Sequence, residues 1–229
     1  RINEGEQVSF SFTIIEGQPL REVVANIAKQ PHLTQDLDPE NLATQISSTQ
    51  ENLEGWLFPD TYHYHSEDSA SGLLKRAYSK MQQELEAAWQ KRAPDLVLNS
   101  PYEALILASI IEKETGLASE RPLISAVFTN RLKTNMRLQT DPTVIYGIGA
   151  DFDGDIKRKD LTTYTPYNTY KIKGLPPTPI AMPSKAALLA AVNPPESEYV
   201  YFVSKGDGSH QFSKTLQEHN RAVKQYQLN

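Results

Sequence analysis

The sequence of 229 residues contains no cysteine. Without a thiol the chain can form no disulfide, no thiolate metal site and no cysteine nucleophile, and it suits a reducing or an oxidising compartment equally well. No apolar run approaches the roughly 20 residues that a helix needs to cross a bilayer. The chain begins at Arg1 without a signal-peptide pattern. We therefore expect a fragment of a longer protein, with room for a membrane anchor upstream of it.

An excess of positive charge is also missing. The 23 basic and 28 acidic residues give a formal net charge of -5 and are scattered along the chain, so nucleic acid is not an expected partner. The sequence has no glycine-rich phosphate loop of Walker or Rossmann spacing, and its stretch 205–208 is typical of a hairpin turn. His63 and His65 would lie on one side of a strand without a third ligand nearby. We expect no metal and no cofactor.

The composition, with 39% hydrophobic and 22% charged residues, is that of a folded globular protein. Apolar periodicity predicts strands over 8–14 and 199–203 and a strand-like aromatic stretch over 56–64. It predicts helices from residue 20, over 70–88, over 102–115, from 119, over 184–192 and from 215. Strands and helices that do not alternate regularly favour an α+β fold over a doubly wound parallel sheet.

The local sequence also predicts where several helices begin and which stretches connect the elements. We predict N-caps within 66–69 and at Ser119, Ser184 and Thr215. The stretches 30–50 and 136–183 show little periodicity and are predicted to be connections. The second is long for a structureless connection, which indicates a functional surface.

The most informative feature is Glu112-Lys113-Glu114-Thr115 at the end of the apolar helix predicted over 102–115. Residues two apart on a helix point about 200° from each other, so the two glutamates cannot face one small site. Glu114 projects on the apolar side, where desolvation and the negative end of the helix dipole would raise its pKa. A general acid working near neutral pH needs these properties. The alternative is a salt-bridged rim residue beside Lys113 or Arg121.

Polar residues in the second half of the chain are candidates for substrate contacts. Asp141 precedes a proline, which is an N-cap signature that would present Gln139 and Thr140 beside the start of a helix. A cap alone explains Asp141 but not Gln139. Tyr167 and Asn168 offer a flat apolar face and hydrogen-bonding groups, which suit a sugar chain, so we expect them to line a cleft. The alternative is that these loop residues only pack.

Five stretches carry a resemblance to a known family. In order they are ASIIEKET (108–115), SER (119–121), MRLQTDPTVIYG (136–147), YNTY (167–170) and GLPP (174–177). Together they resemble the MltG/YceG-like family of endolytic murein transglycosylases over about residues 53–229. The resemblance implies that Glu114 is the general acid/base. It also implies cleavage of the β-1,4 bond between N-acetylmuramic acid and N-acetylglucosamine within glycan strands, which leaves 1,6-anhydro ends.

The resemblance has further implications for organisation and location. Members carry one N-terminal helix that anchors them in the bacterial inner membrane, a LysM-like module, and a catalytic domain in the periplasm. Residues 1–50 would then be a strand-helix unit and connection that adjoin the module, and residues 51–229 the catalytic domain. Peptidoglycan glycan strands are the implied substrate, and peptidoglycan synthases are candidate protein partners.

Other functions stay open at this point. A non-catalytic peptidoglycan-binding protein would need only the surface rich in tyrosine and proline. A pyridoxal-phosphate-dependent aminodeoxychorismate lyase, a label that relatives of the family have carried, needs a Schiff-base lysine and a phosphate cup that we cannot nominate. A glycoside hydrolase normally needs two carboxylates about 5 to 9.5 Å apart. Asp60 and Asp141 have ordinary turn and capping explanations, so we expect an internal nucleophile instead.

Overall fold

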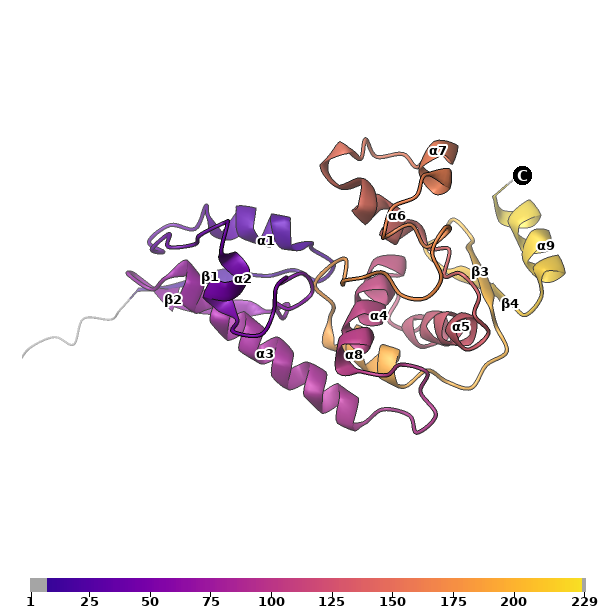
Figure 1. Ribbon diagram of the computed structural model, residues 1–229, viewed down its shortest axis with the longest axis horizontal. Coiled ribbons are helices and arrows are strands. Elements are labelled where there is room, and N and C mark those ends of the chain that lie inside the picture. Colours follow the sequence, from indigo (N-terminus) through magenta and orange to yellow (C-terminus); the bar gives the residue numbers. More distant parts are fainter. Residues whose placement is uncertain (1–7, 228–229) are drawn as a thin grey trace, which may run out of the picture.

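The structure, a computed structural model, describes residues 8–227. These residues fold into helices and two small antiparallel sheets that loops connect (Figure 1). Because both sheets are antiparallel and helices dominate, the predicted α+β class is confirmed. In chain order the elements are β1 (Ser9–Thr13), α1 (Leu20–Ile27), α2 (Leu42–Ile46), β2 (Thr61–His65), α3 (Ala70–Gln90), α4 (Pro101–Glu114), α5 (Arg121–Lys133), α6 (Asp141–Ile148), the 3-10 helix η1 (Gly149–Asp151), α7 (Arg158–Thr162), α8 (Lys185–Val192), β3 (Tyr201–Ser204), β4 (His210–Ser213) and α9 (Leu216–Tyr226).

The first sheet joins segments that are far apart in the sequence. β1 pairs with β2 in antiparallel register, with Ser9 opposite His65. Phe12, Tyr62 and Tyr64 are buried because alternate residues of a strand point to the same face. β1 lies before residue 50 and β2 after it, so the sheet contains strands from both sides of the division that the sequence suggests. That division stays a prediction.

The helix α4 lies at the centre of the core. Its residues 104–111 are buried, and α3, α5 and α8 pack against it. The helix begins after Ser100, whose side chain accepts a hydrogen bond from the backbone N–H of Glu103. It ends at Glu114 because Thr115 adopts extended backbone angles, so the predicted bound at residue 115 is one residue too far. An almost fully buried helix therefore presents Glu114 as its last residue.

The predicted N-caps differ in their outcome. Ser69, Ser184 and Thr215 each accept a hydrogen bond from a backbone N–H three residues further on, so these predictions are confirmed. The prediction at Ser119 is wrong, because Glu120 is the residue that precedes α5 and it makes no side-chain cap. The carboxylate of Glu120 binds β4 instead.

The two stretches predicted as connections are more regular than expected. Residues 30–50 contain α2, and residues 136–183 contain α6, η1 and α7. The helices α2 and α7 have five residues each, which is too short to produce a periodic signal in the sequence. Within 8–227, no helix is long and apolar enough to cross a membrane. The same residues contain no group of three or more His, Asp or Glu placed to hold a metal ion.

Candidate active site

Glu114 is half-buried at the end of α4 and lines a cavity of about 530 Å³. The hydroxyl of Thr140, directly before α6, donates a hydrogen bond to the Glu114 carboxylate. The wall of this cavity comes from α5, from the loop before α6, from β3 and β4, and from α9. Its lining residues include Arg131, Gln139, Asp141, Tyr170, Tyr201 and His210. The end of α4 thus presents one carboxyl to a space large enough for a ligand.

The surroundings of Glu114 shift its acidity. Burial raises the pKa of Glu114 from its ordinary 4.5 to about 7. The Thr140 hydroxyl lowers this pKa, the negative charge of Asp141 raises it, and the positive charge of Arg131 lowers it. A carboxyl with a pKa near neutrality can both give and take a proton under ordinary conditions.

Glu112 is placed differently, as helical geometry predicts. Its carboxylate pairs with Arg121 at 3.1 Å and accepts hydrogen bonds from the backbone N–H and the hydroxyl of Ser184. Lys113 donates to a backbone carbonyl in the turn before α1. Since the two nearby cations have these other partners, the interpretation of Glu114 as a rim residue paired with Lys113 or Arg121 is wrong.

The loop before α6 is held in a conformation that few residues adopt. Gln139 has a φ of 51°, in the left-handed region, and its N–H donates to the carbonyl of Thr169 at 3.2 Å. The N–H of Thr140 donates to the Thr169 hydroxyl at 3.0 Å. The predicted cap at Asp141 is wrong, since Thr140 is the N-cap residue and Asp141 accepts a hydrogen bond from Tyr170 at 2.6 Å. A long-range partner therefore replaces the local cap.

Arg131 holds this loop from the side of α5. The residue is 7% exposed, and its Nε donates to the carbonyl of Val200 at 2.6 Å. Its Nη1 donates to the carbonyl of Leu138 at 2.7 Å and, at 3.4 Å, to Oε1 of Gln139. The guanidinium also lies 5.3 Å from the centre of the Tyr201 ring. Arg131 was not predicted from the sequence, although a charge within the apolar stripe of α5 was a signal.

Tyr167 and Asn168 do not line the cavity at Glu114. Asn168 is 1% exposed, and its side-chain amide donates to the carbonyl of Thr163 at 2.6 Å. Tyr167 packs against Tyr146, with ring centres 4.8 Å apart, and its hydroxyl lies 2.8 Å from the Thr178 hydroxyl. The structure thus brings Gln139 and Thr140 to Glu114, whereas Tyr167 and Asn168 lie elsewhere. Their contact with substrate stays a prediction.

A second carboxyl with altered acidity belongs to Glu54, which is 5% exposed. Its Oε1 accepts a hydrogen bond from the N–H of Leu20 and its Oε2 from the Tyr146 hydroxyl, each at 2.9 Å. Burial raises the pKa of Glu54 to about 7, although both hydrogen bonds lower it. Glu54 therefore ties the start of α1 to α6. The sequence signal was an acid between Leu53 and the apolar, aromatic run that begins at Trp56.

The free energy of unfolding is expected to fall as the pH rises from about 4.5 to about 7. In this window the native state keeps protons on Glu54 and Glu114 that the unfolded chain has already released, so deprotonation favours unfolding. One pKa unit corresponds to about 1.4 kcal/mol, so each group contributes up to about 3 kcal/mol. Urea unfolding at several pH values measures the slope. Glu54→Gln should make it shallower, and an unchanged slope would contradict the burial of an ionisable Glu54.

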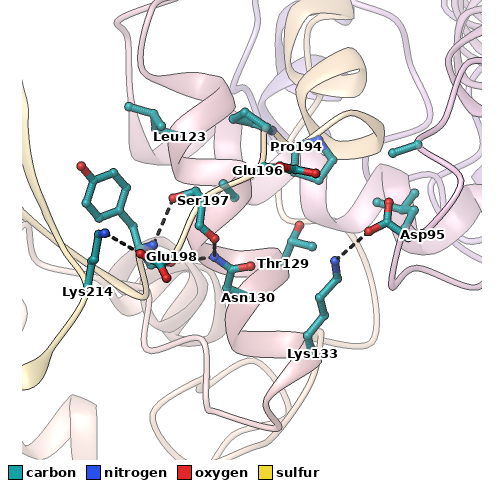
Figure 2. A pocket seen from close by; sticks show the side chains of 15 residues that line it. Asp95, Leu123, Thr129, Asn130, Lys133, Pro194, Glu196, Ser197, Glu198 and Lys214 are labelled. Atoms are coloured by element: carbon teal, nitrogen blue, oxygen red, sulfur yellow. Dashed lines mark hydrogen bonds and ion pairs between the residues drawn. The ribbon is translucent and has the colours of Figure 1, made fainter.

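Another cavity, of about 600 Å³, is lined by different residues of α5 and by residues 194–199 (Figure 2). Figure 2 shows Lys133 paired with Asp95, and Lys214 paired with Glu198. Both pairs are largely exposed, and Lys214 keeps the pKa of Glu198 below its ordinary value. A carboxylate kept ionised by a cation is a poor proton donor near neutral pH. The candidate acid therefore lies in the cavity at Glu114.

Fold and site together define an α+β protein with one candidate acid/base glutamate beside a cavity. The model of the YceG-like family matches residues 1–225, so the chain belongs to this family. A crystal structure of a yceG-like protein from Listeria monocytogenes is similar to it, with a TM-score of 0.74 and 34% identity, over 92% of this chain and 75% of that one.

Two curated relatives have names that describe an activity. The chain is 35% identical over 238 residues to the endolytic murein transglycosylase of Bacillus subtilis strain 168, which covers 95% of this chain. It is 31% identical over 206 residues to the endolytic murein transglycosylase of Streptococcus pneumoniae serotype 2 strain D39, which covers 87% of this chain. The chain spans 65% and 36% of the lengths of these two relatives.

Proposed function

We propose that this chain is the catalytic part of an endolytic murein transglycosylase. The observation that carries the proposal is the half-buried Glu114, with a pKa of about 7, in a cavity of about 530 Å³. The names of the two curated relatives support the same reaction. Glu54 has a similarly raised pKa but is tied to Leu20 and Tyr146, whereas Glu114 lines a cavity, which is where a proton donor can reach a substrate.

In this mechanism Glu114 acts twice. Its protonated carboxyl donates a proton to the glycosidic oxygen between N-acetylmuramic acid and N-acetylglucosamine, and the bond from the anomeric carbon to that oxygen breaks. The 6-hydroxyl of the muramic acid then attacks the anomeric carbon, and the Glu114 carboxylate takes its proton. The acid is regenerated, no water is consumed, and the product ends in 1,6-anhydro-N-acetylmuramic acid. Gln139 and Thr140 are proposed to contact the substrate or to orient Glu114 for both steps.

A second candidate reaction is hydrolysis, and Asp141 is the observation that favours it. This carboxylate lines the same cavity as Glu114 and raises the pKa of Glu114 by its charge. A hydrolase would use such a second carboxylate to activate water or to attack the sugar. Asp141 accepts a hydrogen bond from Tyr170 instead, and that bond would be broken or shared in such a role.

The product identifies the reaction. We expect purified sacculi digested in heavy-oxygen water to yield fragments with unlabelled 1,6-anhydro ends, as seen by mass spectrometry. The matched control is Asp141→Asn, which should retain this product because the internal nucleophile needs no second carboxylate. Reducing muramic acid ends that carry solvent oxygen as the main product, lost in Asp141→Asn, would establish a hydrolase and overturn the transglycosylase proposal.

The remaining proposals concern organisation. Murein lies outside the cytoplasmic membrane, so the catalytic domain is proposed to act in the periplasm, on a chain that an N-terminal helix anchors in the inner membrane. Residues 1–50 are proposed to adjoin a LysM-like module and residues 51–229 to form the catalytic domain. Peptidoglycan synthases are proposed as partners. Tyr167 and Asn168 are proposed to shape the loop near the substrate, with Tyr167 the more accessible of the two.

A further inference from the structure

One face of α9 lines the cavity at Glu114. The residues of this face are Leu216, His219, Asn220 and Val223 of the helix together with its C-cap residue Gln227, and their spacing of three, four, seven and eleven positions from the first places them on one helical stripe. We call them the α9 stripe. The helix packs against β3 and β4, and its buried residue Ala222 is not part of the stripe. The α9 stripe therefore faces the cavity while other residues of the helix hold it in place.

Much of the α9 stripe is exposed to solvent. Leu216 is 56% exposed, and Asn220 is exposed as well, whereas Val223 is half-buried. An exposed apolar side chain alone is common on protein surfaces. Here it lines the same cavity as the candidate acid, together with carboxamides that can donate and accept hydrogen bonds. Apolar groups between polar groups are the pattern of a ligand-binding wall.

A stack of side chains fixes the α9 stripe relative to Glu114. The ring of His219 stacks on the ring of Tyr201, with centres 5.1 Å apart and planes 21° apart. The guanidinium of Arg131 lies 5.3 Å from the centre of the same Tyr201 ring. Arg131 in turn holds the loop that places Thr140 on Glu114. The wall and the acid thus belong to one connected set of contacts, so a ligand on the α9 stripe would have a defined position relative to Glu114.

His219 adds hydrogen-bonding capacity without adding charge. Burial and the positive charge of Arg131 lower the pKa of His219, which favours the neutral ring near pH 7. Within residues 8–227, its Nδ1 is buried without a hydrogen-bond partner. A neutral ring, two carboxamides and two aliphatic side chains suit an uncharged polar ligand with apolar faces. A pyranose ring has this character, with C–H groups on its faces and hydroxyl and acetamido groups at its rim.

We propose that the α9 stripe is a sugar-binding subsite that holds a pyranose ring of the glycan strand beside the bond that Glu114 cleaves. The identity of the sugar rests on the proposed function. Leu216 and Val223 pack on a face of the ring, while Asn220 and Gln227 bind groups at its rim. A glycan is the expected ligand because the α9 stripe is continuous with the cavity at Glu114.

The test measures binding separately from cleavage. Titration calorimetry with an octasaccharide of alternating N-acetylglucosamine and N-acetylmuramic acid is carried out on Glu114→Gln proteins. Adding Leu216→Ala and Asn220→Ala together should raise the Kd about 10-fold, the size expected when about 1.4 kcal/mol is lost. The matched control is Gln217→Ala on the same helix, which is exposed and does not line the cavity. Its Kd should stay within about twofold of the parent.

The same substitutions in the active enzyme give a second readout. The double variant should raise KM about 10-fold and leave kcat within about threefold, because the subsite binds ground state and transition state alike. The single variants are also measured, so that a folding defect in one leaves the other informative. Unchanged Kd and KM in folded variants would overturn the subsite. A dimer broken by Leu216→Ala, with unchanged glycan affinity, would instead make the α9 stripe a self-association surface.

Failure of the subsite and failure of the proposed function remain distinguishable. If the wild type cleaves sacculi and the α9 stripe variants bind normally, the subsite is wrong and the function stands. If the wild type cleaves no sacculi but the variants lose octasaccharide affinity, the function is wrong and the subsite stands.

Discussion

Glu114→Gln is expected to lower the rate of glycan cleavage about 1,000-fold or more while leaving the fold intact. The amide keeps the shape of the side chain and can still accept the hydrogen bond from Thr140, but it has no proton to transfer. Replacing this half-buried carboxyl should leave the melting temperature unchanged or higher at pH 7.5, because the neutral amide carries no charge that burial would penalise. The measurements are initial rates on sacculi and thermal unfolding of the same protein samples.

Glu112→Gln on the same helix is the matched control, with the opposite expectation. Glu112 pairs with Arg121 and binds Ser184, so its replacement should lower the free energy of unfolding by about 1 to 3 kcal/mol and leave most of the activity. A folded Glu114→Gln protein with near wild-type cleavage would remove Glu114 from the mechanism. Loss of cleavage in a folded Glu112→Gln protein alone would place the acid on the other side of α4.

Arg131→Met should have the second largest effect, this time on both stability and activity. The substitution leaves the carbonyls of Val200 and Leu138 without their buried donor, which should cost about 3 kcal/mol or more in the free energy of unfolding. The loop that carries Gln139 at a φ of 51° would also lose its support, so Thr140 would no longer be held on Glu114. Urea unfolding and sacculus digestion measure the two losses.

The pH profile separates a positioning role of Arg131 from simple instability. The charge of Arg131 lowers the pKa of Glu114, so its removal should raise that pKa. In the proposed mechanism cleavage needs protonated Glu114, so the alkaline limb of the residual activity should move to higher pH in Arg131→Met. Arg131→Lys keeps the charge and should keep the limb near that of the wild type. Equal stability and an identical pH profile in Arg131→Met would show that Arg131 does not act on Glu114.

Sequence periodicity predicted the elements whose contacts are regular along the chain. The helices α3 and α9 were visible as apolar stripes and α4 as a helix that is apolar nearly all round, and the caps at Ser184 and Thr215 followed from local chemistry. The place of Glu114 at the end of a buried helix was also accessible, because helical geometry fixes which side it faces.

What sequence could not provide depends on contacts between distant segments. Asp141 carries a local capping signature, yet its partner is Tyr170, 29 residues away, and no local rule weighs one against the other. Arg131 is fixed by Val200, 69 residues further on. Asn168 was expected in a cleft because polar loop residues are usually exposed, but its amide donates to the carbonyls of Leu161 and Thr163 at the end of α7.

The chain completes the surroundings of Glu114 late in its own synthesis. The acid lies at position 114, but the carbonyl that fixes Arg131 lies at Val200, and β3, β4 and α9 supply much of the cavity wall. A growing or truncated chain that stops before residue 200 would carry the glutamate on its helix without much of the cavity wall and without the carbonyl that binds Arg131. If the proposed activity holds, a chain cut before residue 200 should therefore keep Glu114 and lose glycan cleavage.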